Sequence, residues 1–174
     1  MTAEPCSVAD GGGPETFLRG FVGVFTLIEP ISDVRKRVHR AIDDSIASLS
    51  WAVRTVGRPL LRQAAHIPEW IRFEGSASQL TVGFSGGIFS GDIALHSSLD
   101  GPRTPQRLVA GISGEVMHVR VNDRTLRTDI FSDSGKITNV YELVGDGVLE
   151  GRVRMEADDV PLPIEYGMRL RRGR

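Results

Sequence analysis

Ser90, Asp92 and His96 are the residues of this sequence whose types match a hydrolytic triad. They lie in a segment, 88–96, whose composition predicts a strand, so all three side chains fall on one face. Alternate side chains on one strand face are about 7 Å apart, which is too far for the hydrogen bonds that activate a serine nucleophile. The spacing therefore argues against covalent catalysis.

Metal and cofactor chemistry finds no support in the residue pattern. The four histidines follow no metal-binding spacing such as His-Glu-x-x-His. The single cysteine, Cys6, excludes an internal disulfide and a metal site built on thiolates. Gly86-Gly87 and the other glycines do not form a glycine-rich loop between a strand and a helix. We therefore expect neither a metal nor a cofactor.

Composition indicates one ordinary globular domain. The chain has 174 residues, 40% of them hydrophobic and 25% charged, with a formal net charge of -1. This charge gives no reason to expect nucleic acid or an anionic membrane as a partner. No apolar run reaches the ~18 residues that span a bilayer, and 1–14 lacks the features of a secretory signal, so we expect a cytoplasmic protein. Residues 1–15 are predicted to be a disordered leader and 16–174 a single domain.

The elements that must position any site are mainly strands. In 148–157, Leu149, Val153 and Met155 alternate with charged residues, which is the pattern of a strand with one buried face. Similar segments follow one another from 69 to 172, separated by turn residues such as Asn122-Asp123. Such a succession predicts an antiparallel meander of about 8–10 strands, closed into a barrel to protect its edges.

A helix pair is predicted between the first and second strands. The first strand is expected at 17–28. Apolar residues then recur every three or four positions from Val34 to Val56, which predicts one long amphipathic helix that stops at Gly57. Pro59 suits the first turn of a shorter helix, so the helical insert spans about 32–66.

Several side chains are candidates for the barrel interior. Methionine fills irregular apolar space, and tyrosine or asparagine can meet a polar group on a bound molecule. His118, in contrast, shares a strand face with Arg120 and is expected to be in solvent. Trp51 could lie over the barrel mouth or pack on its rim. The candidate ligand-binding residues are Tyr141, Tyr166, Asn139, Met117, Met155, Met168, Phe25 and Trp51.

This element order resembles the calycin group, which includes lipocalins and intracellular fatty-acid-binding proteins. Gly23-Val24-Phe25 stands where lipocalins carry Gly-x-Trp, and Arg169 or Arg171 could match their arginine near the chain end. Tyr166 is similar to the tyrosine of the Arg-x-Tyr carboxylate clamp, but Ile164 replaces the arginine. The resemblance implies a barrel that binds a hydrophobic molecule, without that clamp.

Two functions follow, and enzyme status stays open between them. The first is an intracellular barrel that encloses a small hydrophobic molecule such as a lipid, an isoprenoid or a polyketide-like product. The alternative is a bacterial natural-product cyclase, which would close rings, for example by [4+2] addition, by holding its substrate in a reactive conformation. Such a cyclase or isomerase needs no metal or nucleophile. A third possibility is a solid-core barrel whose outer surface binds a protein.

Overall fold

The elements follow the alternation of apolar and polar residues in the sequence. The computed structural model describes residues 13–85, 92–109, 112–145 and 147–173. Its helices are α1 (Pro14–Phe21), α2 (Ile31–Ser45) and α3 (Trp51–Ala64). Its strands are β1 (Gly23–Leu27), β2 (Trp70–Ser76), β3 (Gln79–Phe84), β4 (Ile93–Ser97), β5 (Thr104–Val109), β6 (Ile112–Asn122), β7 (Thr125–Ser132), β8 (Gly135–Gly145), β9 (Val148–Ala157) and β10 (Ile164–Arg172).

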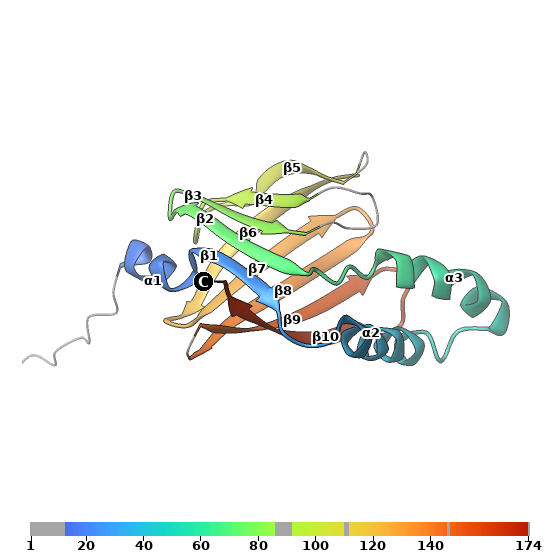
Figure 1. Ribbon diagram of the computed structural model, residues 1–174. Helices are drawn as coiled ribbons and strands as arrows, with labels where there is room; N and C mark the ends of the chain where they lie inside the picture. Colours follow the sequence, from blue (N-terminus) through green and yellow to red (C-terminus); the bar gives the residue numbers. More distant parts are fainter. Residues whose placement is uncertain (1–12, 86–91, 110–111, 146, 174) are drawn as a thin grey trace, which may run out of the picture.

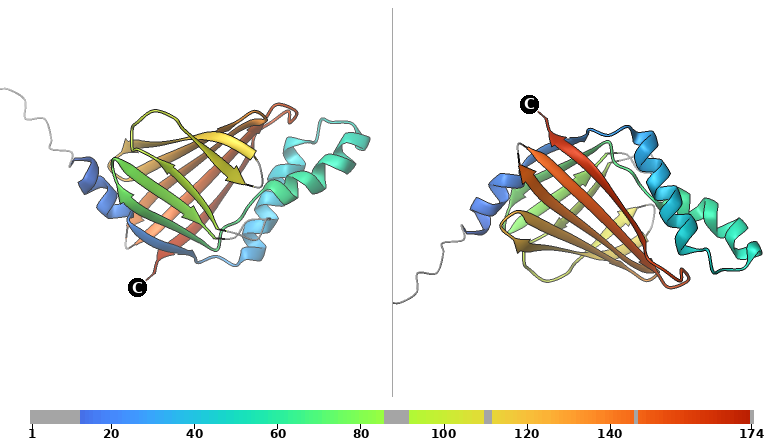
Figure 2. Two further views of the ribbon diagram at one scale, coloured as in Figure 1. Left: turned by 90° about the horizontal axis from the view of Figure 1, so that it is seen from above. Right: turned by 90° about the horizontal axis from the view of Figure 1, so that it is seen from below.

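The strands form one antiparallel sheet in the order β4-β3-β2-β1-β10-β9-β8-β7-β6-β5. The sheet curls until its two edge strands approach each other, which gives a nearly closed barrel (Figure 1). Helix α1 lies at one end of the barrel, and the pair α2–α3 lies at the other (Figure 2). We call these the closed end and the open end. The predicted meander barrel with a helix pair after its first strand is confirmed.

Among the described residues, the seam where β4 meets β5 and β6 is held by side chains and by one isolated bridge. Near the closed end, Leu99 forms an isolated parallel bridge with His118 on β6. Elsewhere along the seam, the side-chain amide of Gln106 on β5 makes hydrogen bonds to the backbone of β4. Its oxygen accepts a hydrogen bond from the His96 backbone N–H (2.9 Å), and its nitrogen donates to the Ala94 carbonyl (3.5 Å).

The start of the domain differs from the strand expected at 17–28. Residues Pro14–Phe21 form helix α1, and β1 begins only at Gly23. Pro14 suits the first turn of a helix, and Phe17, Leu18 and Phe21 fall on one helical face, where all three are buried. Large apolar residues at helical spacing were therefore mistaken for a two-faced strand. The remainder of the expected leader, 1–12, lies outside the described residues.

The single long helix expected up to Gly57 is wrong in its boundaries. Helix α2 ends at Ser45, and α3 starts at Trp51 with Gly57 and Pro59 inside it. The side chain of Ser50 accepts a hydrogen bond from a backbone N–H of the first α3 turn (3.5 Å), which favours a new helix start. A continuous apolar stripe does not reveal such a break.

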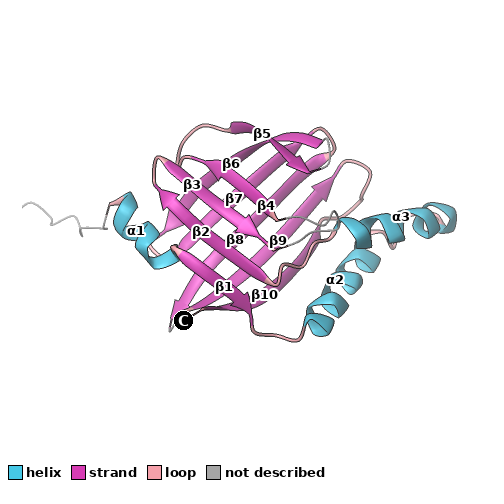
Figure 3. Ribbon diagram, turned by 45° about the horizontal axis from the view of Figure 1, so that its top comes forward, coloured by secondary structure: helices cyan, strands magenta, loops and turns pink. Residues whose placement is uncertain are grey.

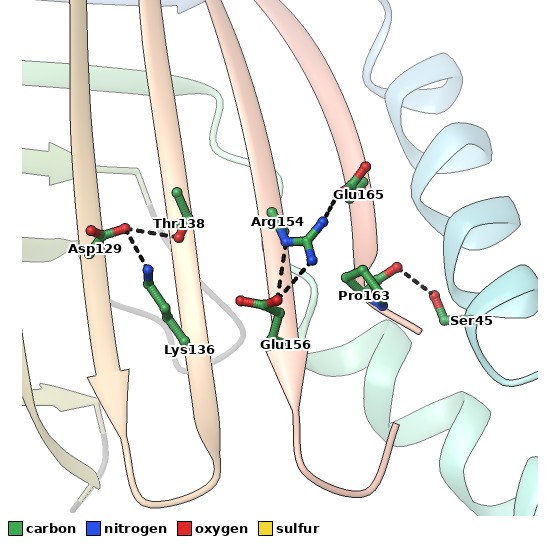
Figure 4. A network of polar contacts seen from close by, with 8 residues as sticks. All are labelled: Ser45, Asp129, Lys136, Thr138, Arg154, Glu156, Pro163 and Glu165. Atoms are coloured by element: carbon green, nitrogen blue, oxygen red, sulfur yellow. Dashed lines mark hydrogen bonds and ion pairs between the residues drawn. The ribbon is translucent and has the colours of Figure 1, made fainter. Parts of the chain in front are cut away.

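Helix α2 packs on the barrel wall where β1 ends. Its apolar face, with Val34, Val38 and Ile42, is fully buried and contacts β10. The Ser45 hydroxyl donates to the Pro163 carbonyl (3.2 Å) (Figure 4). Helix α3, in contrast, extends away from the barrel (Figures 1 and 3).

The outer face of the barrel carries the charged residues. Arg154 pairs with Glu156 (2.8 Å) on its own strand and with Glu165 on the next (Figure 4). Asp129 accepts a hydrogen bond from Thr138 (2.8 Å) and pairs with Lys136 (3.3 Å). The Arg154 pairs are exposed to solvent, whereas the Asp129 carboxylate is only 1% exposed.

Candidate functional site

Aromatic side chains fill the barrel interior next to α1. Phe73 lies at their centre, with ring centroids 5.6 Å from Phe21, 5.8 Å from Phe25 and 5.2 Å from Tyr141, all edge-to-face. The four side chains are at most 2% exposed. The closed half of the barrel is therefore a packed core, and any binding site inside the barrel must lie toward the open end.

A row of mostly polar side chains crosses the interior above this core. The strand register places side by side residues from five consecutive strands, β6 to β10. Each is buried with less than one tenth of its surface exposed. We call this set the middle row; its members are His118, Thr128, Asn139, Val153 and Tyr166.

His118 and Thr128 satisfy each other inside the barrel. The imidazole Nε2 lies 3.3 Å from the Leu95 carbonyl, which can only accept, so Nε2 carries the proton. Nδ1 then accepts from the Thr128 hydroxyl at 2.9 Å. Burial lowers the pKa of His118 to about 4, because desolvation penalises the imidazolium. The ring is therefore neutral around pH 7 and links β6 to β4 and β7.

Tyr166 is also engaged by the protein itself. Its hydroxyl donates to the His66 carbonyl at 2.9 Å, which ties the segment after α3 to the barrel wall. The His66 imidazole Nε2 in turn lies 2.6 Å from the Ser85 carbonyl. Burial raises the pKa of Tyr166 and lowers that of His66, so both side chains are neutral near pH 7.

Asn139 is the member of the middle row with open hydrogen-bonding capacity. Its residue is 7% exposed, and its amide has no hydrogen-bond partner among the residues that the structure describes. The amide atoms of Asn139 are not among the fully buried polar atoms that lack a partner, so they still contact solvent. An amide offers two donors and one acceptor, and one that faces the interior without a protein partner is a candidate contact for a bound molecule.

Toward the open end, the inner face is apolar and reached by solvent. Ile130, Ile137 and Met155 are in register with one another across β7, β8 and β9, one step beyond the middle row. Ile93 on β4 and Leu108 on β5 belong to the same core, and all five are only partly buried. Partly exposed apolar side chains on an inner face are what an apolar guest could cover. We call these five residues the mouth.

The structure distributes the predicted site residues over several places. Tyr166 and Asn139 lie in the middle row, and Met155 lies in the mouth. Tyr141, Phe25 and Met168 are buried deeper, and the Tyr141 hydroxyl has no partner among the described residues. The expectation that Met117 points inward is wrong, because its neighbours Val116 and His118 are the fully buried, inward-facing residues of this strand and side chains alternate faces. Trp51, at 75% exposure, stands free on α3 rather than on the barrel rim.

His118 and Thr128 were missed as interior residues. His118 was expected in solvent because its strand also carries Arg120 on the same face. That face points inward, and Arg120 turns its guanidinium toward α1, over the Phe17 ring (5.1 Å to the centroid) and beside Asp123. A charged residue near a strand end can thus reach solvent from an inner face, which alternation alone does not show.

The triad-like residues do not form a site in the described structure. His96 lies on the exposed face of β4, where its Nδ1 is 2.9 Å from the Thr81 hydroxyl, while neighbouring Leu95 points inward. Asp92 is exposed, and Ser90 lies outside the described residues. Among the described residues, no three His, Cys, Asp or Glu side chains come together as metal ligands.

Two open grooves lie on the outer face of the barrel. One, of about 640 Å³, runs over β8, β9 and β10 beside α2, and its charged lining includes Arg152, Arg154 and Arg169, each paired with a glutamate. The other, of about 780 Å³, lies around Phe131 near the β7–β8 turn. Neither groove contains a mouth residue.

Comparisons with known proteins establish the fold. No family model and no curated protein matches this sequence. A fatty acid binding protein of Schistosoma mansoni, solved in complex with arachidonic acid, matches with a TM-score of 0.53 and 15% identity, over 93% of this chain and 100% of its own. An abundant heat soluble (SAHS) protein of Ramazzottius varieornatus matches with a TM-score of 0.59 and 9% identity, over 88% and 96%.

A luciferase domain of the dinoflagellate Lingulodinium polyedrum matches with a TM-score of 0.52 and 11% identity, over 97% of this chain and 46% of that one. At such identities a structural likeness shows a shared fold and not a shared function. The calycin-like barrel inferred from the order of elements is thereby confirmed. No described helix is both long and apolar enough to cross a membrane.

Proposed function

We propose that the open end of this barrel binds a small hydrophobic molecule. The observation that carries the proposal is the mouth: five apolar side chains from five strands face inward and are only partly buried. Covering apolar surface is favourable by about 25 cal/mol per Å². The Schistosoma mansoni protein with the same fold was solved with arachidonic acid, which supports the proposal by analogy.

The proposed guest occupies only the outer half of the barrel. Phe73 and Tyr141 fill the interior near α1, so a guest rests on the middle row instead of crossing the whole barrel. Met155 and Tyr166 then lie beside it, whereas Met168 and Phe25 support the floor from below. We propose a reducing cytoplasm as the location of the protein, on the basis of the sequence pattern alone.

Binding can be tested by filling the mouth. Ile137→Trp inserts a large ring among the mouth residues, and Val140→Trp places the same ring on the outer face of the same strand. Nile red, a neutral apolar dye, should bind the unmodified protein and Val140→Trp alike. Its affinity for Ile137→Trp should fall about tenfold or more, because the guest's apolar contacts are displaced. Native mass spectrometry of the purified protein should also show an apolar molecule bound.

Equal dye affinity for both variants would place the binding surface elsewhere and refute the proposal. Thermal unfolding of the two variants serves as the control for folding.

The cyclase alternative stays a prediction from the sequence. Ring closure by preorganisation needs only a shaped apolar site, and the mouth with Asn139 beneath it is compatible with that chemistry. No contact among the described residues favours it over binding alone. Conversion of a linear polyene substrate by the purified protein, absent in Ile137→Trp, is the result that would support it.

A further inference from the structure

The polar groups beneath the mouth are all uncharged. His118, Thr128, Asn139 and Tyr166 carry no charge at neutral pH, because the histidine is buried and deprotonated. Arg120, which shares the inner face, holds its guanidinium at the closed end beside Asp123. Arg172 also lies on the inner face, but at the closed end, where its guanidinium stands over the Phe25 ring (5.0 Å to the centroid) and donates to the Gly20 carbonyl. Within the described residues, the other lysines, arginines and acids lie on the outer face, on helices or in turns.

An ionised head group would therefore lose its hydration without gaining a counter-charge. Bringing an isolated carboxylate or ammonium into such surroundings costs several kcal/mol even after the protein relaxes. A hydroxyl, ester, aldehyde or amide loses far less hydration, and one good hydrogen bond compensates most of that loss. The interior therefore discriminates by charge even though it carries none.

Only one member of the middle row is available for such a hydrogen bond. His118 and Thr128 bond to each other at 2.9 Å, and the Tyr166 hydroxyl donates to the His66 carbonyl at 2.9 Å. Asn139 as a residue is 7% exposed, and its amide, which still contacts solvent, has no partner among the described residues. In the strand register, Asn139 lies between Thr128, which is polar, and Val153, which is apolar.

We infer that the guest of the mouth is an uncharged amphiphile whose polar group hydrogen-bonds to Asn139, and not a free fatty acid. This inference rests on the proposed binding function. Fatty alcohols, aldehydes, esters and amides belong to this chemical class, and so do isoprenoid alcohols. The apolar chain lies among Ile130, Ile137 and Met155, and the head group points inward toward the middle row.

The test compares ligands that differ only in the head group. Dodecanol, dodecanamide and dodecanoic acid are each used to displace Nile red from the full-length protein near neutral pH, where the acid is ionised. The alcohol and the amide should bind about tenfold or more tightly than the acid, which corresponds to about 1.4 kcal/mol. Asn139→Leu should weaken the alcohol and the amide about fivefold relative to the acid.

Val140→Leu, on the outer face of the same strand, is the matched control and should change none of these affinities. Two results overturn the inference while binding itself survives: the acid binds as tightly as the alcohol, or Asn139→Leu leaves the ratio of alcohol to acid affinity unchanged. If Nile red and all three ligands fail to bind the unmodified protein, the proposed function fails together with the inference.

Discussion

His118 shows how one buried side chain joins stability to pH. It is fully buried, it bonds to Leu95 on β4 and Thr128 on β7, and its pKa is about 4 against 6.5 for an exposed histidine. The unfolded chain therefore binds a proton at a pH where the folded chain does not. The stability contributed by the neutral ring is fully present above about pH 6.5 and is lost as the pH falls toward 4.

Between about pH 7.5 and pH 4.5, this difference in pKa should lower the free energy of unfolding by about 2–3 kcal/mol. Carboxylates also titrate in this range, so the comparison is with His118→Gln, which cannot take up the proton. Urea unfolding at both pH values should show a smaller loss in the variant. Equal losses in the two proteins would mean that the imidazole is not buried as described.

Residue identity alone indicated only part of the site. Asn139, Tyr166 and Met155 were recognised from their types and strand positions, and the structure brings them to the inner face. Met117 was expected inside the barrel and His118 in solvent, and the structure shows the reverse. Both faces of their strand carry a mixture of apolar and polar residues, so alternation alone does not assign them. That ambiguity is resolved only by pairing with β7, which sequence periodicity does not encode.

At the scale of elements, helix α1 covers the closed end of the barrel. Its apolar face enters the aromatic core, and Phe21 lies 5.6 Å from Phe73 with no exposed surface. Phe21→Ala should lower the free energy of unfolding by about 3–5 kcal/mol, because it leaves a cavity in a packed interior. Val22→Ala, at a 43% exposed neighbour, should change it by about 0.5 kcal/mol or less.

Urea unfolding measures both α1 variants. A small effect of Phe21→Ala, similar to that of Val22→Ala, would show that α1 is not part of the cooperative core.

The strands were easier to predict than the helices. The segment 148–157 matches the bounds of β9, because it combines alternating apolar and charged residues with turn residues at its ends. Helix α1 and the break before Trp51 were missed, since short helices at a barrel end owe their form to packing and caps. Local pattern thus predicts the sheet better than what covers its ends.

At the scale of the molecule, the barrel is asymmetric along its axis. The α1 end is packed with aromatic rings, the middle row is polar and neutral, and the mouth is apolar and partly exposed. The helix pair stands beside the mouth, with α2 on the wall and α3 directed away (Figure 3). The order of elements predicted the barrel. How much of its interior is filled depends on contacts between side chains from different strands, such as Phe73 with Tyr141, and the order of elements does not predict these.

The central claim is that a guest binds at the mouth, and methyl NMR tests its position directly. Isoleucine and methionine methyl groups are observed while dodecanol is added to the full-length protein. The account predicts shifts for Ile93, Ile130, Ile137 and Met155, with Met117 on the outer face and Ile42 on the buried face of α2 unchanged. Shifts confined to Met117 or Ile42, or none at any mouth residue, would contradict it.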